Sequence, residues 1–351
     1  MRLIVTALLA GSLLAQEDPR FGARARLVLV PAVVTDPQGH TVDNLDAGDF
    51  VVLDNGKRRE AGVDTFATGV APIALIVAVQ AAGISRPALD KIRKIGAMIQ
   101  PLVSGERGCA GLIAFAEKVD WLAPCTNDVD KLSTAFERLR PGDEKRARML
   151  DAANEAIRAL REQANSRRVL LIISETRDRG SETGLDAVIE QVQQAGIAVY
   201  FAAYSAFKTA WTQRTPEIER GVPKPPSRPS EQTGTIDGSP PSGVRPQIPP
   251  ASSQVDILGG IGEIGRMGKR NTAAELTAAT GGMTFSFARL KGLEDAIVKL
   301  GDELHSQYVL SFPPDSSEAG YHRLEVRVNR PGQFKIRARP GYWSDAPGGT
   351  P

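Results

Sequence analysis

Few of the side chains that can do acid–base, nucleophilic or metal chemistry stand at the spacings that such chemistry needs. The three histidines, His40, His305 and His322, are far apart in the chain, whereas metal sites gather their ligands at short spacings. Ser174 precedes Glu175, but no base accompanies this pair. No nucleophile elbow, phosphate loop or dinucleotide fingerprint occurs. We therefore predict that the protein is not an enzyme, and a hydrolase of unrecognised type is the less favoured alternative.

The overall charge of the chain favours neither nucleic acid nor an acidic surface as a partner. The 351 residues carry a net charge of +2, and no basic stripe interleaved with aromatic residues occurs. Apolar residues make up 42% and charged residues 24%, which is typical of a globular protein with a sizeable core. We expect no cofactor and no nucleic acid partner. Three acidic residues of a predicted helix are interpreted as its solvated face: Asp151, Glu155 and Glu162.

The first fifteen residues have the pattern of a secretory signal peptide. Arg2 precedes an apolar run over residues 3–14, and the small residue Ala15 follows it. We expect cleavage near Ala15 and export to the periplasm or the extracellular space. The alternative is an N-terminal membrane anchor, for which the run is short. No later run approaches the ~20 apolar residues of a membrane helix, so we expect no membrane span.

Two cysteines in an exported chain raise the question of a disulfide. Cys109 and Cys125 belong to apolar segments that a short connection joins, which predicts a β-hairpin. If the turn is centred on Glu117, the two cysteines lie directly opposite each other, close to bridging distance. We expect a disulfide between them, and two small buried thiols are the alternative.

The segment over residues 72–83 is the predicted centre of the fold. It is a nearly unbroken apolar run between Pro72 and Gly83, as in a strand buried on both faces. Ser85 and Pro87 then open a helix. In an open α/β sheet, ligands bind where the chain leaves the carboxyl end of such a strand. A site is therefore expected around residues 78–85.

Strands and helices alternate over residues 70–305, which predicts an α/β domain with a largely parallel sheet. Further strands are predicted at 169–174, 197–203 and 283–287, and helices at 85–102, 129–139, 145–163, 185–192, 272–279 and 292–304. Within this domain, residues 212–255 hold ten of the 24 prolines. We expect this insertion to be disordered, as either a spacer or a polyproline ligand.

Two β-rich segments, residues 20–69 and 306–344, flank the α/β domain. Asp54-Asn55-Gly56 in the first is a strong hairpin signal. Neither segment alone is large enough to bury two sheet faces. We therefore expect their strands to form one β-sandwich into which the α/β domain is inserted. Residues 345–351 are expected to be a disordered tail.

The order of these elements, with a hairpin after the first helix, resembles a von Willebrand factor type A (VWA) domain, which is a Rossmann-like α/β fold with helices on both faces. Short stretches sharpen this to the VWFA-related proteins of Acidobacteria. The stretches that carry the resemblance lie at 27–39, 45–50, 54–56, 279–282, 307–310 and 337–342. Together they span nearly the whole chain outside the insertion and the signal peptide.

The resemblance implies a metal-ion-dependent adhesion site, at which a divalent cation, usually magnesium, binds a D-x-S-x-S motif, a Thr and an Asp from three loops. The matching positions here hold Ala78, Gln80, Ala82, Ala147 and Glu175. Only Glu175 offers a carboxylate, whereas Mg²⁺ requires a nearly octahedral set of oxygen ligands. We therefore expect a degenerate adhesion site that binds no metal.

The remaining hypothesis is that the protein is an adhesion or interaction module that binds an unidentified protein partner without metal. Its rim at the carboxyl edge of the sheet would comprise Gln80, Ser85, Asp143, Lys145, Arg146, Arg148, Glu175, Arg177, Asp178 and Arg179. Alternatively, these charges only keep the loops soluble, and the protein is a structural or assembly component of the cell envelope in which the VWA-like domain is a scaffold.

Overall fold

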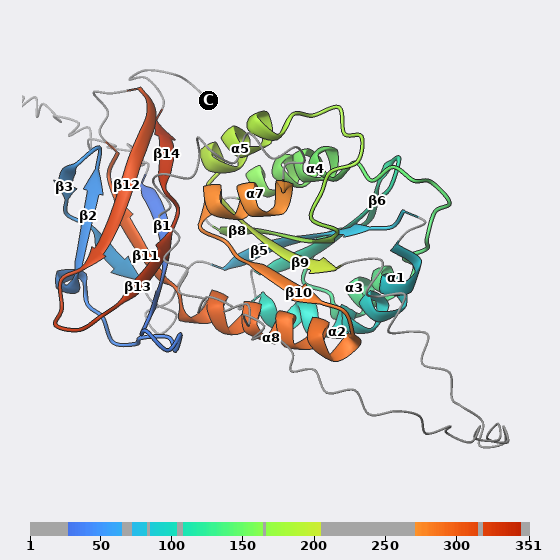
Figure 1. Cartoon of the computed structure of the whole chain (residues 1–351), viewed down its shortest axis with the longest axis horizontal. Coiled ribbons are helices and arrows are strands. Elements are labelled where there is room, and N and C mark those ends of the chain that lie inside the picture. Colours follow the sequence, from blue (N-terminus) through green and yellow to red (C-terminus); the bar gives the residue numbers. More distant parts are fainter. Residues whose placement is uncertain are drawn as a thin grey trace, which may run out of the picture.

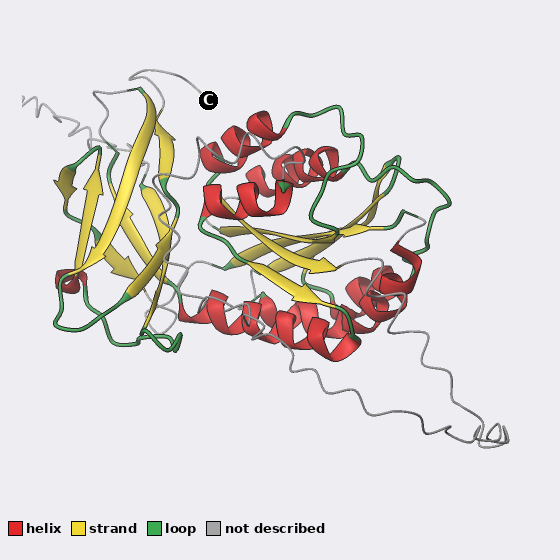
Figure 2. Ribbon diagram, in the orientation of Figure 1, coloured by secondary structure: helices red, strands yellow, loops and turns green. Residues whose placement is uncertain are grey.

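The computed structural model describes residues 27–64, 72–82, 85–103, 108–163, 166–204, 271–314 and 319–344. The expected signal peptide, the proline-rich insertion at 212–255 and the tail at 345–351 lie outside these residues. Figures 1 and 2 show a β-sandwich beside an α/β part in which helices cover both faces of a sheet. Among the described residues, no helix combines the length and the apolar character that a membrane crossing requires.

A six-stranded sheet forms the centre of the α/β part, in the order β10-β9-β8-β5-β6-β7. All neighbours pair in parallel except β6 and β7, which form an antiparallel edge hairpin. This arrangement confirms the α/β fold class predicted from the sequence. The strands are β5 (Ile73–Gln80), β6 (Cys109–Phe115), β7 (Val119–Thr126), β8 (Arg167–Ser174), β9 (Ile197–Tyr204) and β10 (Thr284–Phe287).

Strand β5 is buried along its whole length because it has helices on both sides. Its side chains alternate between two cores, as the pleat of a strand requires. Leu75 and Val77 pack on one side, and Ala74 and Ala78 pack on the other. The first side is covered by α1 (Arg86–Ile92), α2 (Gly96–Ile99), α3 (Val129–Glu137) and α8 (Leu290–Ser306), and the second by α4 (Met149–Arg161), α5 (Leu185–Gln194) and α7 (Thr272–Thr280).

Two of the predicted helices differ from the structure. The helix expected from residue 145 begins only at Met149, because Ala147 is extended and pairs with Arg179. The helix expected over 85–102 is divided into α1 and α2 with short 3₁₀ turns between and after them. Gly96 begins α2, and a side chain there would lie only 3.0 Å from Cβ of Phe136, so this helix packs closely on α3.

The disulfide between Cys109 and Cys125 is present, with Cα atoms 5.2 Å apart. The reason given for it from the sequence is wrong, because the cysteines are not direct cross-strand partners. The register of the hairpin shifts twice between its tip and the disulfide, so that Ala110 pairs with Thr126. Pro124 lies in the shifted stretch, where its missing N–H is tolerated on an edge strand.

The N-terminal and C-terminal strands pair with each other in two antiparallel sheets around a shared core. Strand β1 (Val28–Thr35) lies between β13 and β11, and β2 (Phe50–Asp54) pairs with β12. The β-sandwich expected from the sequence is therefore present. The other strands are β3 (Lys57–Arg59), β4 (Gly62–Asp64), β11 (Tyr308–Phe312), β12 (Gly320–Val328), β13 (Lys335–Ala338) and β14 (Gly341–Ser344); β14 was not predicted.

Buried polar contacts fix the sandwich to the α/β part. Arg337 of β13 forms an ion pair with Glu303 of α8 and donates a hydrogen bond to the carbonyl of Gly281. Gln307, directly before β11, donates to the hydroxyl of Tyr200 in β9 at 2.8 Å, and its side-chain oxygen accepts from Arg167, at the start of β8, at 3.5 Å. The sandwich therefore adjoins the end at which the parallel strands begin, and their carboxyl ends point away from it (Figure 1).

Candidate functional site

Three of the five adhesion-site positions belong to the core beneath the carboxyl edge. Ala78, Ala82 and Ala147 are each 1% exposed or less and pack in the core that α4 covers. Their methyl groups therefore contribute to packing and offer no oxygen ligand.

The other two adhesion-site positions, Gln80 and Glu175, are linked to each other by a hydrogen bond, and Glu175 also forms an ion pair with an arginine. The Gln80 side-chain oxygen accepts a hydrogen bond from the backbone N–H of Glu175 at 3.0 Å. The Glu175 carboxylate lies 2.8 Å from the Arg179 guanidinium. Only one carboxylate and one amide oxygen are thus offered, and both already have partners. This donor set does not fit Mg²⁺, which requires about six oxygen ligands.

No other metal centre is evident in the part of the chain that the structure describes. There, no group of three or more His, Cys, Asp or Glu side chains is close enough to hold a metal ion. The second amide atom of Gln80, Nε2, is buried without a hydrogen-bond partner.

The loops at the carboxyl edge are joined into one surface by backbone hydrogen bonds. Ala147 and Arg179 donate to each other's carbonyl at 3.0 Å in both directions, which links the loop before α4 to the loop after β8. The N–H of Arg148 donates to the carbonyl of Ala116 at 2.9 Å, which adds the tip of the β6–β7 hairpin. Three segments far apart in the sequence therefore hold fixed positions relative to one another.

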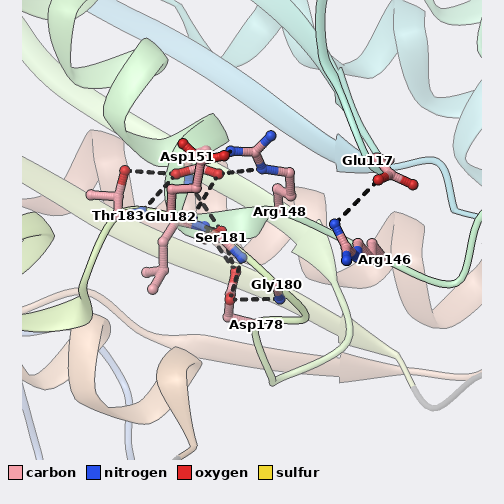
Figure 3. A network of polar contacts seen from close by, with 10 residues as sticks. Glu117, Arg146, Arg148, Asp151, Asp178, Gly180, Ser181, Glu182 and Thr183 are labelled. Atoms are coloured by element: carbon pink, nitrogen blue, oxygen red, sulfur yellow. Dashed lines mark hydrogen bonds and ion pairs between the residues drawn. The ribbon is translucent and has the colours of Figure 1, made fainter.

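Asp178 shapes the loop after β8 and does not extend from the surface (Figure 3). One carboxylate oxygen accepts from the backbone N–H of Leu150 at 3.2 Å and from the hydroxyl of Ser181 at 2.6 Å. The other accepts from the N–H groups of Gly180 and Ser181 at 3.2 and 3.1 Å. Because Leu150 lies in the first turn of α4, Asp178 also satisfies one of the N–H groups that a helix leaves unpaired at its start.

Asp151 forms a second network beside this one (Figure 3). Its Oδ1 accepts from the N–H and the hydroxyl of Thr183 at 2.9 and 2.6 Å. Its Oδ2 accepts from Arg148 Nε at 2.6 Å and from the N–H of Glu182 at 3.1 Å. Arg148 also lies 2.8 Å from the Glu182 carboxylate. Burial raises the pKa of Asp151, but the hydrogen bonds, those from Thr183 foremost, outweigh it and hold the pKa below its usual value.

The sequence interpretation of Asp151 as part of a solvated helix face is therefore wrong. Its side chain is 14% exposed and ties α4 to the loop before α5. The available signal was its place in the first turn of a helix, where carboxylates interact favourably with unpaired N–H groups. The partner residues, Glu182 and Thr183, lie 31 and 32 positions later, so spacing along the helix could not reveal them.

The predicted rim residues differ in how accessible they are. Gln80 and Ser85 are 1% and 0% exposed, and the Ser85 hydroxyl accepts a hydrogen bond from Tyr204 at 2.7 Å. Their burial corrects the expectation that they contact a partner. The exposed members of the rim are Asp143, Lys145, Arg146, Arg177 and Arg179, whereas Arg148, Glu175 and Asp178 are half-buried.

Most charges of the rim are already paired. Arg146 lies 3.2 Å from Glu117 at the hairpin tip (Figure 3), and Asp143 lies 3.3 Å from Arg86. Within the described part of the chain, Lys145 and Arg177 form no ion pair. A groove of about 630 Å³ runs beside the Asp151 network and is lined by Lys118, Val119, Asp120, Arg148, Asp151, Asn154, Glu155, Glu182 and Thr183.

No protein-family model matches the chain, and no curated protein matches it. Solved structures similar to it include the conserved hypothetical protein BatB from Bacteroides thetaiotaomicron, at 15% identity and a TM-score of 0.40 over 66% of this chain and 98% of that chain. An aerotolerance-related membrane protein from Bacteroides fragilis is similar at 14% identity and a TM-score of 0.39, over 66% and 99% of the two chains.

The SpRpn10 VWA domain, the type of domain that the sequence resembles, is similar at 16% identity and a TM-score of 0.31, over 39% of this chain and 79% of that chain. All three TM-scores are below 0.5.

Proposed function

We propose that the chain is an exported, non-enzymatic interaction module with a VWA-like domain, and that a protein partner binds the carboxyl edge of its six-stranded sheet. The observation that carries this proposal is the backbone pairing of Ala147 with Arg179. It holds two loops as one fixed surface at the end of the sheet that points away from the sandwich (Figure 1). A surface that is ordered before binding loses less conformational entropy when a partner docks.

Binding at this edge does not involve a metal ion in our proposal. The degenerate adhesion site has three core alanines, an amide oxygen that already accepts a hydrogen bond, and a carboxylate paired with Arg179. Introducing a cation here would place it beside a guanidinium group without the ligands to compensate for the repulsion. We therefore assign recognition of the partner to side chains at the carboxyl edge.

Lys145 and Arg177 are the rim residues that we assign to direct contact with the partner. Both are exposed, and neither forms an ion pair with a described residue. The paired residues Arg148, Glu175 and Asp178 instead hold the loops in shape. Under this proposal the protein acts outside the cytoplasm, in the periplasm or the extracellular space, after cleavage near Ala15.

The second candidate is a structural or assembly component of the cell envelope, in which the α/β part is a scaffold. The buried contact of Arg337 with Glu303 favours it, because this contact fixes the α/β part to the sandwich. In that case the sandwich mediates assembly and the charges of the rim only keep the loops soluble.

Charge reversal at the rim separates the two candidates. The double variant Lys145→Glu/Arg177→Glu leaves the ion pairs of the rim intact, and Lys299→Glu, at an exposed position of α8, is the matched control. Each protein is immobilised and exposed to the exported proteins of its producer in the presence of EDTA. We expect the wild type and the control to retain a partner that the double variant loses. Equal capture of the partner by all three proteins would contradict binding at the rim and favour the scaffold role of the α/β part.

A further inference from the structure

The tip of the β6–β7 hairpin lies between two grooves, although it was not among the predicted rim residues. A smaller groove of about 280 Å³ lies near the same tip. Lys118 and Asp120 line both this groove and the larger one. A molecule that contacts these two side chains can therefore extend into either groove.

The hairpin tip is held in place from three directions. The N–H of Ala116 donates to the carbonyl of Lys118 at 2.9 Å and closes the turn. The carbonyl of Ala116 accepts from the N–H of Arg148, and Glu117 pairs with Arg146 at 3.2 Å. Lys118 is exposed and is thus presented on a fixed backbone, which lowers the entropic cost of contacting it.

The smaller groove combines an apolar floor with an excess of positive charge. Ala81, Ala114 and Leu122 supply the floor, and the charged lining comprises the cations Lys118, Arg138 and Arg140 against the anions Asp120 and Glu144. Lys118 and Arg138 are exposed and form no ion pair with any residue that the structure describes. Such a groove favours a ligand that carries carboxylates beside an apolar side chain.

Strand β7, which borders the groove, is an edge strand of the six-stranded sheet. Edge strands can accept an additional extended chain through backbone hydrogen bonds. The register shifts and Pro124 interrupt the half of β7 near the disulfide, so a regular partner strand has room only along the half near the tip. Trp121, which is 39% exposed, lies in that half.

From this juxtaposition we propose that the hairpin tip and the smaller groove bind an extended acidic segment of a partner protein, with an apolar side chain of that segment on the groove floor. The inference rests on the proposed interaction function and names the chemistry of the partner. Lys118 and Arg138 contact the carboxylates, and the half of β7 near the tip lies alongside the bound backbone.

The test uses two synthetic peptides with the full chain. One is acetyl-Asp-Val-Glu-Val-Asp-amide, and the other is its basic counterpart acetyl-Lys-Val-Lys-Val-Lys-amide. Fluorescence anisotropy of labelled peptides measures the affinity, and hydrogen exchange of the backbone locates the bound peptide. The proteins are the wild type, Lys118→Glu/Arg138→Glu, and the control Lys299→Glu.

We expect the acidic peptide to bind the wild type at least about tenfold more tightly than the basic peptide, and to slow exchange over residues 116–123. The double variant should lose this preference, and the control should keep it. Equal affinity for the two peptides, no binding of the acidic one, or an unchanged preference in the double variant would overturn the inference. Loss of the natural partner in Lys145→Glu/Arg177→Glu would still support the proposed function in each of these cases.

Discussion

Ala147 and Arg179 exchange backbone hydrogen bonds of 3.0 Å in both directions, although 32 positions separate them in the chain. Ala147 is 1% exposed, whereas Arg179 is exposed and pairs with Glu175. The two residues thus join the core beneath the carboxyl edge to the charged surface above it. The loops that would hold a cation in an adhesion site are here held by the protein's own backbone and by the networks around Asp151 and Asp178.

Replacement of Asp151 should loosen this edge. Asp151→Asn removes the charge of the carboxylate that accepts hydrogen bonds from Arg148 and Thr183. A hydrogen bond to a charged group contributes about 1.5–3 kcal/mol to stability. We expect the free energy of unfolding in urea to fall by about 2 kcal/mol. Glu162→Gln, at an exposed position after the same helix, should leave it nearly unchanged. Equal stability of the Asp151→Asn variant and the wild type would show that the network does not stabilise the fold.

The same carboxyl makes stability depend on acid. Its pKa in the folded protein lies below the usual value of about 3.9 for an aspartic acid, so the folded state binds fewer protons at this group than the unfolded state does. Its contribution is fully present above the unfolded pKa and is lost as the pH falls through the lowered folded pKa. The stability gap between wild type and Asp151→Asn should therefore narrow between about pH 5 and about pH 2. A gap that widens in acid would contradict the assigned direction of the shift.

The disulfide should contribute to stability by restricting the unfolded chain. Cys109 and Cys125 are separated by 16 positions, and closing a loop of that size is worth about 3 kcal/mol in the chain-entropy model. We expect Cys109→Ser/Cys125→Ser to lower the free energy of unfolding by that order. Reductant should bring the wild type close to the variant and leave the variant unchanged. A wild type that is insensitive to complete reduction would contradict this prediction.

The contact between the sandwich and the α/β part should be sensitive to loss of one charge. Glu303→Gln leaves Arg337, whose side chain is 28% exposed, without its carboxylate partner. Breaking a buried pair in this way typically costs about 3–5 kcal/mol, and the partly exposed arginine places the expected loss near about 3 kcal/mol. Asp302→Asn, an exposed neighbour on α8, is the control. Matching urea midpoints for the two variants would exclude a stabilising role of the pair.

Much of the architecture could be predicted because it depends on local patterns. The apolar run of β5 can only be buried on both faces, and Asn55-Gly56 supplies the positive φ angles, +49° and +80°, of a tight hairpin. The two cysteines were paired correctly. The register shifts around Pro124 could not be predicted, because no repeating pattern in the sequence indicates them. They arise where an edge strand accommodates a residue without an N–H group.

The candidate site was less predictable because its geometry depends on contacts between distant segments. The positions of Ala78 and Glu175 at one edge followed from parallel topology. That Gln80 would be buried beneath Glu175, and that Asp151 would hold the loop before α5, required the packing of side chains from different loops. The hairpin tip likewise joins this edge through the hydrogen bond between Arg148 and Ala116, which links segments that are distant in the sequence.

The central claim is that the carboxyl edge binds a protein partner without metal. The most direct test is the affinity of the captured partner for the wild type and for Lys145→Glu/Arg177→Glu, each measured in EDTA and again in Mg²⁺. The account predicts equal affinity of the wild type in both solutions, and a loss of at least about tenfold in the variant in both. Binding that requires Mg²⁺, or that the two reversed charges leave unchanged, would contradict it.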